Sequence, residues 1–287
     1  MANCYLFLPK GCVFMKTGVQ LYSVRTDLAE DFEGTLKAVS EMGYEGVEFA
    51  SLCGKKPEEV AELCKKYNLN PISAHVPFDS LNNLTEKTML DFAAVGCKYI
   101  VIPYLPPELR PGTDGFNEVV QYAERIGKAA KENGMTLLYH NHDFEFKKIG
   151  DEYALDYLYR TVSKEYLETE VDTCWVNVAG VEPAEYVRKY SGRAPIVHLK
   201  DFYKKEGAAS GKMYKLIGLD DNEAADENEA FSFRPLGMGM QNVQSLLDAA
   251  TDAGAEWVIV EQDEPWNGMT RMESIKASIE YLKTLKY

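Results

Sequence analysis

The chain has 287 residues, of which 46% are hydrophobic, and a formal net charge of −14 at pH 7. This charge argues against a nucleic-acid backbone or an anionic membrane surface as partner, because binding phosphates requires concentrated Lys and Arg. No apolar run reaches the roughly 18 residues needed to cross a bilayer, and the six cysteines form no CxxC pair, which favours reduced thiols in the cytoplasm.

The first 14 residues do not have the pattern of a signal peptide. The apolar stretch from Cys4 to Leu8 is short, and it lacks a basic start and a small-residue cleavage site. A rhythm of strands and helices begins at Met15. We therefore expect an irregular leader over residues 1–14, a folded domain over residues 15–287, and Met15 as the functional start.

Short apolar runs of β type then alternate with amphipathic helical stretches about eight times. The helix over residues 32–42 is a clear example: Phe32, Leu36, Val39 and Met42 recur at helical spacing, and Gly43 ends the pattern. The predicted strands are residues 19–22, 46–49, 72–75, 99–103, 136–140, 170–172, 196–198 and 258–261.

Eight such units without a long linker predict a closed (β/α)8 TIM barrel, and hence one α/β domain. The main alternative is an open, doubly wound sheet. That fold normally carries a Gly-rich phosphate loop after its first strand. Here the first strand continues into Gln20-Leu21-Tyr22-Ser23, with neither GxGxxG nor GxxxxGK[ST].

One connection interrupts the rhythm. After the seventh strand, a polar and partly acidic segment extends over about residues 201–235. Loops of this length are uncommon in compact domains and are either functional or disordered. Both a lid over the substrate and a solvated insertion fit this segment.

The four histidines all lie where a predicted strand gives way to polar residues, and two further strands end in carboxylates. Side chains alternate across a strand, so residues two apart share a face. In a barrel, the ends of the strands meet at one rim. This brings together His140, Asp172, His198 and Glu261, a donor set that suits Mn²⁺, Zn²⁺, Co²⁺ or Mg²⁺ with positions left for substrate oxygens. Taken singly, such a His is more often structural, and such an Asp more often caps a helix.

Several short motifs, in this order and spacing, resemble the sugar phosphate isomerase/epimerase group of the xylose isomerase-like TIM-barrel superfamily. The resemblance runs from about Met15 to the C-terminus and does not specify one substrate. Its motifs are Gly18-Val19-Gln20-Leu21-Tyr22-Ser23, Gly43-Tyr44-Glu45-Gly46-Val47-Glu48, His140-Asn141-His142, Val171-Asp172-Thr173, His198-Leu199-Lys200-Asp201 and Pro235-Leu236-Gly237-Met238-Gly239.

The resemblance implies a metal set of Glu, Asp, His and Glu on strands five to eight. The last three become Asp172, His198 and Glu261, whereas His140 replaces the usual strand-five Glu. In epimerases of this group, both glutamates ligate the metal and exchange protons with the substrate. That two-glutamate mechanism therefore does not transfer directly. Glu261 and His140 are candidate ligands and acid/base groups, and His142 or Glu145 are further acid/base candidates.

Four other residues are candidates for binding the substrate. His75 resembles a position that faces the site in the family, although a structural role fits equally. Glu48 either binds a sugar hydroxyl or bonds locally. Lys200 either holds a sugar oxygen or pairs with Asp172 or Asp201. Trp266 follows the eighth strand, where an aromatic face can stack on a sugar ring; core packing suits Trp175 better.

We therefore expect a divalent-metal-dependent sugar isomerase or epimerase, which moves a proton next to a carbonyl through a metal-stabilised enediolate. The alternatives are a metal-dependent lyase or dehydratase acting on keto-sugars or keto-glycosides, and a catalytically silent barrel that binds sugar. The expected partner is a small sugar or keto-sugar. The sugar, its phosphorylation, the native metal and any homo-oligomer stay open.

Overall fold

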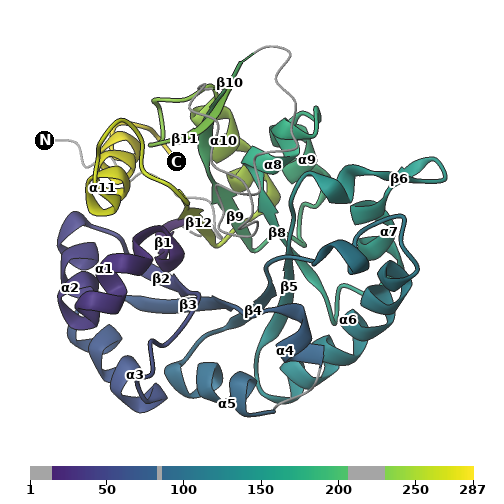
Figure 1. The fold of residues 1–287 in the computed structure, drawn as a ribbon, viewed down its shortest axis with the longest axis horizontal. Coiled ribbons are helices and arrows are strands. Elements are labelled where there is room, and N and C mark those ends of the chain that lie inside the picture. Colours follow the sequence, from purple (N-terminus) through teal and green to yellow (C-terminus); the bar gives the residue numbers. More distant parts are fainter. Residues whose placement is uncertain (1–14, 83–85, 206–229) are drawn as a thin grey trace, which may run out of the picture.

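The computed structural model describes residues 15–82, 86–205 and 230–287. Within these ranges eight parallel strands close into a barrel, in the order β1-β12-β9-β8-β5-β4-β3-β2, and helices surround it (Figure 1). This confirms the predicted (β/α)8 barrel. The expected leader, residues 1–14, lies outside the described residues. The barrel strands are β1 (Lys16–Gln20), β2 (Gly46–Phe49), β3 (Asn70–His75), β4 (Tyr99–Ile102), β5 (Thr136–His140), β8 (Glu168–Asp172), β9 (Ile196–Leu199) and β12 (Trp257–Val260).

Helices cover the outside of the barrel, and no helix in the described ranges combines the length and apolar character needed to cross a membrane. Three short 3₁₀ turns span Leu21–Val24, Pro107–Leu109 and Phe144–Phe146, and a small hairpin pairs β6 (Lys148–Ile149) with β7 (Glu152–Tyr153). The α-helices are α1 (Arg25–Glu30), α2 (Phe32–Met42), α3 (Pro57–Lys66), α4 (Phe78–Asn82), α5 (Glu86–Val95), α6 (Gly115–Glu132), α7 (Ala154–Thr161), α8 (Thr173–Val178), α9 (Pro183–Lys189), α10 (Val243–Ala253) and α11 (Arg271–Leu282).

The helix boundaries follow from capping residues. The predicted helix over residues 32–42 is confirmed as α2: the Asp31 side chain accepts a hydrogen bond from the Gly34 N–H, and Gly43 ends the helix at a φ of 100°. Only glycine adopts this left-handed conformation without strain. Gly254 ends α10 in the same way, at a φ of 78°.

The first strand lies earlier than predicted. The sequence pattern predicted residues 19–22, but β1 ends at Gln20. The side chain of Gln20 accepts a hydrogen bond from the Tyr22 N–H at 2.9 Å, and this bond turns the chain into a 3₁₀ helix. An apolar run alone does not reveal such a turn, because it continues past the point where the strand ends.

The barrel interior is filled by apolar side chains that project inward from the strands. Two glycines, Gly18 on β1 and Gly46 on β2, leave room for Ile72 on β3: a Cβ added to Gly18 would lie 2.5 Å from Cδ1 of Ile72. Close packing of this kind tolerates little change in volume. The inner cluster consists of Ile72, Tyr99, Val101, Leu138, Ile196, Trp257 and Ile259.

The segment expected as an insertion, residues 201–235, begins and ends in strands. β10 (Asp201–Lys204) pairs antiparallel with β11 (Phe231–Arg234), and residues 206–229 lie outside the described residues. Both carboxylate oxygens of Asp201 accept backbone hydrogen bonds. These bonds come from Phe202 and Gln241 to Oδ1 and from Gly237 and Gly239 to Oδ2, at 2.9–3.0 Å. Asp201 thereby fixes the start of β10 to the turn that follows β11.

We expect Gly18→Ala to destabilise the barrel by about 1–3 kcal/mol, because the new methyl group overlaps Ile72. Ile72→Val removes the overlapping Cδ1 atom and alone costs about 0.5–1.5 kcal/mol. The penalty of Gly18→Ala is therefore smaller in the Ile72→Val background than in the wild type. Urea unfolding of the four proteins measures this coupling, and equal penalties in both backgrounds would contradict the packing argument.

Candidate metal centre and pocket

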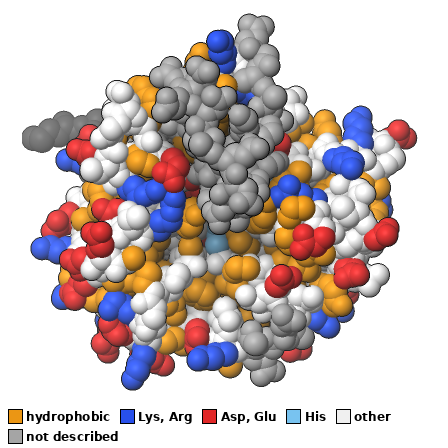
Figure 2. Space-filling model, viewed as in Figure 1, with side chains coloured by type: hydrophobic (Ala, Val, Ile, Leu, Met, Phe, Trp, Pro, Cys, Tyr) orange, Lys and Arg blue, Asp and Glu red, His pale blue; other side chains and the backbone are white. Residues whose placement is uncertain are grey.

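A pocket of about 430 Å³ opens at the carboxyl ends of the barrel strands. Figure 2 shows a histidine at the centre of this face, framed by hydrophobic side chains. Active sites of (β/α)8 barrels lie at this end, where loops can vary without disturbing the core. The pocket is lined by Tyr22, Ala50, His75, Pro77, Phe78, Asp79, Pro103, Tyr104, Pro106, His140, His142, Lys200, Glu261 and Asp263.

The four predicted metal ligands converge here. His140, Asp172 and His198 come from β5, β8 and β9, and Glu261 directly follows β12. One ligand atom from each lies within 4.8 Å of all the others, and all four side chains are buried. The strands are parallel and in register, so side chains far apart in sequence arrive at the same level of the barrel. We call this set the outer group.

Asp172 serves two purposes. Its Oδ1 accepts hydrogen bonds from the N–H groups of Cys174 and Trp175, at 2.8 and 3.0 Å, and so caps α8. Its Oδ2 is buried and accepts no hydrogen bond from the described residues, although Nε2 of His140 lies 3.7 Å away. A buried carboxylate oxygen without a hydrogen bond is costly. An ion facing Oδ2 would remove that cost.

The outer group therefore fits a divalent cation. It offers two imidazole nitrogens and two carboxylates, a set suited to Zn²⁺, Mn²⁺ or Co²⁺, with coordination positions left for a substrate. His198 directs Nδ1 to Glu261, whose Oε2 lies at 3.1 Å. Its other nitrogen points to deeper carboxylates, and this is how ligating histidines are usually oriented.

Lys200 is the counter-charge of this end of the barrel. Its ammonium lies 2.9 Å from both Glu261 Oε2 and Asp263 Oδ2 and 3.5 Å from Asp172 Oδ2. Burial acts to lower the pKa of Lys200, but the three carboxylates outweigh it and raise that pKa well above its usual value. Burial likewise opposes ionisation of Glu261, yet Lys200 and His198 hold the pKa of Glu261 well below its usual value.

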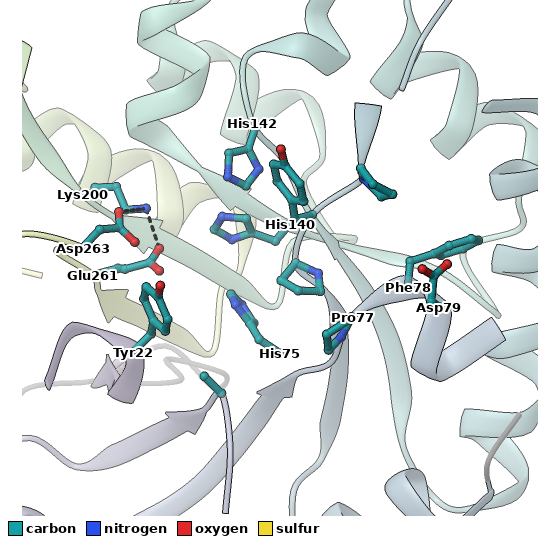
Figure 3. Close-up of a pocket in the computed structure, with 14 residues that line it drawn as sticks. Tyr22, His75, Pro77, Phe78, Asp79, His140, His142, Lys200, Glu261 and Asp263 are labelled. Atoms are coloured by element: carbon teal, nitrogen blue, oxygen red, sulfur yellow. Dashed lines mark ion pairs between the residues drawn. The ribbon is translucent and has the colours of Figure 1, made fainter. Parts of the chain in front are cut away.

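Asp263 was not among the predicted site residues. Burial, opposed by Lys200 and assisted by Glu261, raises its pKa to about 6. The signal was present in the sequence, because Asp263 lies two residues after Glu261 and residues two apart share a face of an extended chain. Its carboxylate lines the pocket beside Lys200 (Figure 3).

His142 also lines the pocket and lies among aromatic rings. Its ring stacks on Phe144, with centroids 5.5 Å apart, and lies 5.0 Å from Trp175 and 5.2 Å from Tyr104. Burial and then the charge of Lys200 hold the pKa of His142 well below its usual value, so the ring is neutral. A neutral imidazole can both donate and accept a hydrogen bond.

A second set of charged groups lies deeper in the barrel. His75 Nε2 is 3.0 Å from Glu48 Oε1 and 2.7 Å from Glu170 Oε1, and His198 Nε2 is 2.8 and 3.1 Å from the same two oxygens. Burial acts to lower the pKa of His75, but the two carboxylates raise it to about 10. We call Glu48, His75, Glu170 and His198 the inner group. Glu170 was not predicted, although it shares a face with Asp172.

The other substrate-binding candidates are placed as follows. Glu48 is fully buried below the pocket and accepts hydrogen bonds from Gln20 and Ser73, so it bonds locally. His75 lines the pocket and also belongs to the inner group. Trp266 is not part of the described pocket lining; the guanidinium of Arg234 lies 3.7 Å from its ring centroid. Trp175 is buried in the core.

We expect Asp172→Asn to abolish tight binding of a divalent cation by the outer group while leaving the fold intact. The amide oxygen can still cap α8, but the charge of the ligand is lost. We expect the affinity for the divalent cation to fall by more than the about 10–100-fold that is typical when a residue hydrogen-bonded to a metal ligand is mutated. Asp172→Ala also removes the cap and costs about 1 kcal/mol of stability. Co²⁺ titration and thermal unfolding of both variants measure this, and an unchanged affinity in Asp172→Asn would refute the ligand assignment.

Glu145 predicts a pH dependence of stability. It accepts hydrogen bonds from the Tyr139 hydroxyl and the His142 N–H, and burial raises its pKa from 4.5 to about 8. The folded protein keeps this proton while the unfolded chain loses it. The free energy of unfolding therefore falls as the pH rises from about 4.5 to about 8.

Glu145→Gln cannot ionise, so the variant loses less stability over this range, by on the order of a few kcal/mol. Urea unfolding at both ends of the range measures the difference. Glu132→Gln, on the exposed side of α6, is the matched control and follows the wild type. If the free energy of unfolding changes with pH equally in Glu145→Gln and the wild type, Glu145 is ionised in the folded protein.

Comparisons with known proteins agree with this fold. An inosose dehydratase of Clostridium beijerinckii is 25% identical over 254 residues, covering 79% of this chain and 82% of that protein. The crystal structure of a sugar phosphate isomerase/epimerase from Parabacteroides distasonis matches with a TM-score of 0.73 at 19% identity, covering 95% of each chain. The IolI protein with a bound zinc atom matches with a TM-score of 0.67 at 16% identity, over 94% of this chain and 97% of that one. The two structural likenesses show a shared fold. The family model for the xylose isomerase-like TIM barrel matches residues 36–285, and the chain belongs to this family.

Proposed function

We propose that this protein is a metal-dependent lyase of the dehydratase type. It removes a proton next to the carbonyl of an uncharged keto-polyol, such as a keto-sugar or a cyclic polyol ketone, and expels a hydroxyl group from the next carbon. The observation that carries the proposal is the position of both buried carboxylates of the pocket lining, Glu261 and Asp263, on one side of the pocket. The likeness to an inosose dehydratase supports it.

Lys200, Asp263 and Glu261 gather on one side of the pocket (Figure 3). Phe78 and Pro77 lie on the far side, where the other carboxylate of the described lining, Asp79, is exposed. An epimerase needs two proton-transfer groups on opposite faces of the substrate. An elimination needs only one face, because one carboxylate can take a proton and pass it to the departing oxygen.

The lining also supports an uncharged substrate. Lys200 is the one Lys or Arg among the described lining residues, and three carboxylates already surround it. A phosphate group would find no unpaired cation in this lining. Pro77, Phe78 and Pro103 instead offer an apolar wall to the C–H face of a sugar or cyclitol ring.

A divalent ion held by the outer group would polarise the carbonyl oxygen of the substrate and contribute several kcal/mol of charge stabilisation. Asp263, with a pKa of about 6, is the base: its carboxylate accepts the proton from the carbon next to the carbonyl. The electron pair of that C–H bond forms the C=C bond, and the C–O bond on the neighbouring carbon breaks. The departing hydroxide takes the proton back from Asp263 and leaves as water.

Lys200 and His142 assist without changing their protonation. The Lys200 ammonium holds the Asp263 carboxylate at 2.9 Å and keeps its own proton, because its pKa is raised. The neutral His142 ring faces the pocket and can donate a hydrogen bond to a substrate hydroxyl. The aromatic rings around His142 limit how it can turn.

The isomerase or epimerase expected from sequence is the second candidate. Glu261 and His142 reach the pocket from different strands, so a substrate between them could exchange a proton with each. The lowered pKa of Glu261 makes it a weaker base than Asp263, which favours the lyase.

Incubation with Mn²⁺ and a panel of uncharged ketones in D₂O distinguishes the two reactions. The panel contains a keto-inositol, a ketohexose and a 3-keto-glucoside. A lyase yields a product that has lost one water, or the aglycone for the glycoside. An epimerase yields a deuterated stereoisomer of unchanged composition. If no ketone yields either product, both candidates are refuted. Protein treated with a chelator is the control.

Asp263→Asn tests the assigned base. We expect its kcat to fall by about 10²–10⁴-fold, because the amide cannot accept the proton. Asp79→Asn is the matched control: it removes an exposed carboxylate from the same pocket and keeps wild-type turnover. A loss of turnover in Asp79→Asn alone would instead assign proton transfer to the far side.

A further inference from the structure

We propose that the inner group, Glu48, His75, Glu170 and His198, binds a second divalent cation below the floor of the pocket. This site is separate from the outer group except that both use His198. It does not depend on which reaction the enzyme performs. Its four residues come from β2, β3, β8 and β9, so the closed barrel alone brings them together.

The first argument is the geometry of the four atoms. The two Nε2 atoms of His75 and His198 alternate with the two Oε1 atoms of Glu48 and Glu170, and the neighbouring atoms are 2.7–3.1 Å apart. Around a tetrahedral Zn²⁺ with bonds of about 2.0–2.1 Å, neighbouring ligand atoms lie about 3.3 Å apart. To hold such an ion, these four pairs of atoms would have to move apart by a few tenths of an ångström.

The second argument is that His198 Nε2 has no hydrogen bond. This atom is buried and lies 2.8 Å from Glu48 Oε1, yet the geometry of a hydrogen bond is not satisfied. In a tetrahedral site, each ligand directs its lone pair at the ion rather than at the neighbouring ligands. Glu170 Oε2 is likewise buried with no hydrogen bond from the described residues.

The third argument is the support behind Glu48. The Gln20 side-chain amide donates to Oε1 at 2.7 Å, and the Ser73 hydroxyl donates to Oε2 at 2.5 Å. All three side chains are fully buried. Groups of this kind fix the orientation of a ligating carboxylate. Here they hold Oε1 facing the two imidazoles.

The fourth argument is charge. Five buried carboxylates belong to the two groups and their neighbourhood, and Lys200 is the one ammonium among the described residues that touches them. With a neutral His75 and a deprotonated His198 ring this leaves five negative charges in excess, of which two divalent cations would balance four. Buried charges without compensation are strongly destabilising. The carboxylates are Glu48, Glu170, Asp172, Glu261 and Asp263.

His198 connects the two sites. Its Nδ1 faces Glu261 of the outer group, and its Nε2 faces the two carboxylates of the inner group. With both ions bound, His198 would give up its ring proton to solvent and offer one nitrogen to each site. The competing arrangement keeps protons on His75 and His198, which then form ion pairs with Glu48 and Glu170 and leave no place for a cation.

Metal stoichiometry separates these arrangements, and it does not depend on finding a substrate. The full chain is stripped with a chelator and dialysed against Zn²⁺, and the bound metal is counted by elemental analysis. We expect two ions per chain in the wild type and one in His75→Gln, Glu48→Gln or Asp172→Asn. One ion in the wild type, or two ions retained in both His75→Gln and Glu48→Gln, would overturn the proposal.

A second measurement covers variants that fail to fold. Crystals of the wild type soaked in Zn²⁺, with data collected at the zinc edge, give one anomalous peak per bound ion. Two peaks, one at the outer group and one between Glu48 and Glu170, support the inner site. A single peak at the outer group refutes it. Neither result bears on whether the protein is a lyase or an epimerase.

Discussion

The dominant physical constraint in this protein is the compensation of buried negative charge. Glu48, Glu170, Asp172, Glu261 and Asp263 are all buried at one end of the barrel, and the nearby ammonium of Lys200 offsets one of them. A barrel can sustain this only with ring protons or cations in the same place. The surplus of carboxylates over cations raises the pKa values of His75, His198 and Lys200, against the opposite effect of their burial.

The period of two residues along each strand divides the charged groups into levels. Glu170 lies one level below Asp172, and His140 one level below His142. His198 and Lys200 are separated in the same way. On β8 the lower residue belongs to the inner group and the upper one to the outer group, whereas after β5 and β9 the upper residues, His142 and Lys200, line the pocket. A register shift of one residue in any of these strands would turn both levels away from the interior at once.

Sequence alone predicted the fold and brought His140, Asp172, His198 and Glu261 to one rim, because parallel strands in a barrel leave little freedom. It did not predict Glu170 or Asp263, since an acidic residue next to a candidate ligand has the same pattern as a surface charge. It also did not predict β10 and β11, because each has only four residues and both lie within the segment that was assigned as a whole to an insertion. The end of β1 depends on one side-chain hydrogen bond of Gln20, which no apolar pattern encodes.

The backbone hydrogen bonds to the Asp201 carboxylate hold both ends of the connection between β10 and β11 in place. Three backbone hydrogen bonds, from Gly237, Gly239 and Gln241, fix the first residue of β10 to the turn after β11, independently of the sequence inserted between the two strands. Insertions, deletions and substitutions between β10 and β11 can therefore accumulate without shifting the adjacent Lys200. The position of Lys200, and with it the balance of charge around Asp172, Glu261 and Asp263, therefore does not depend on the length of that connection.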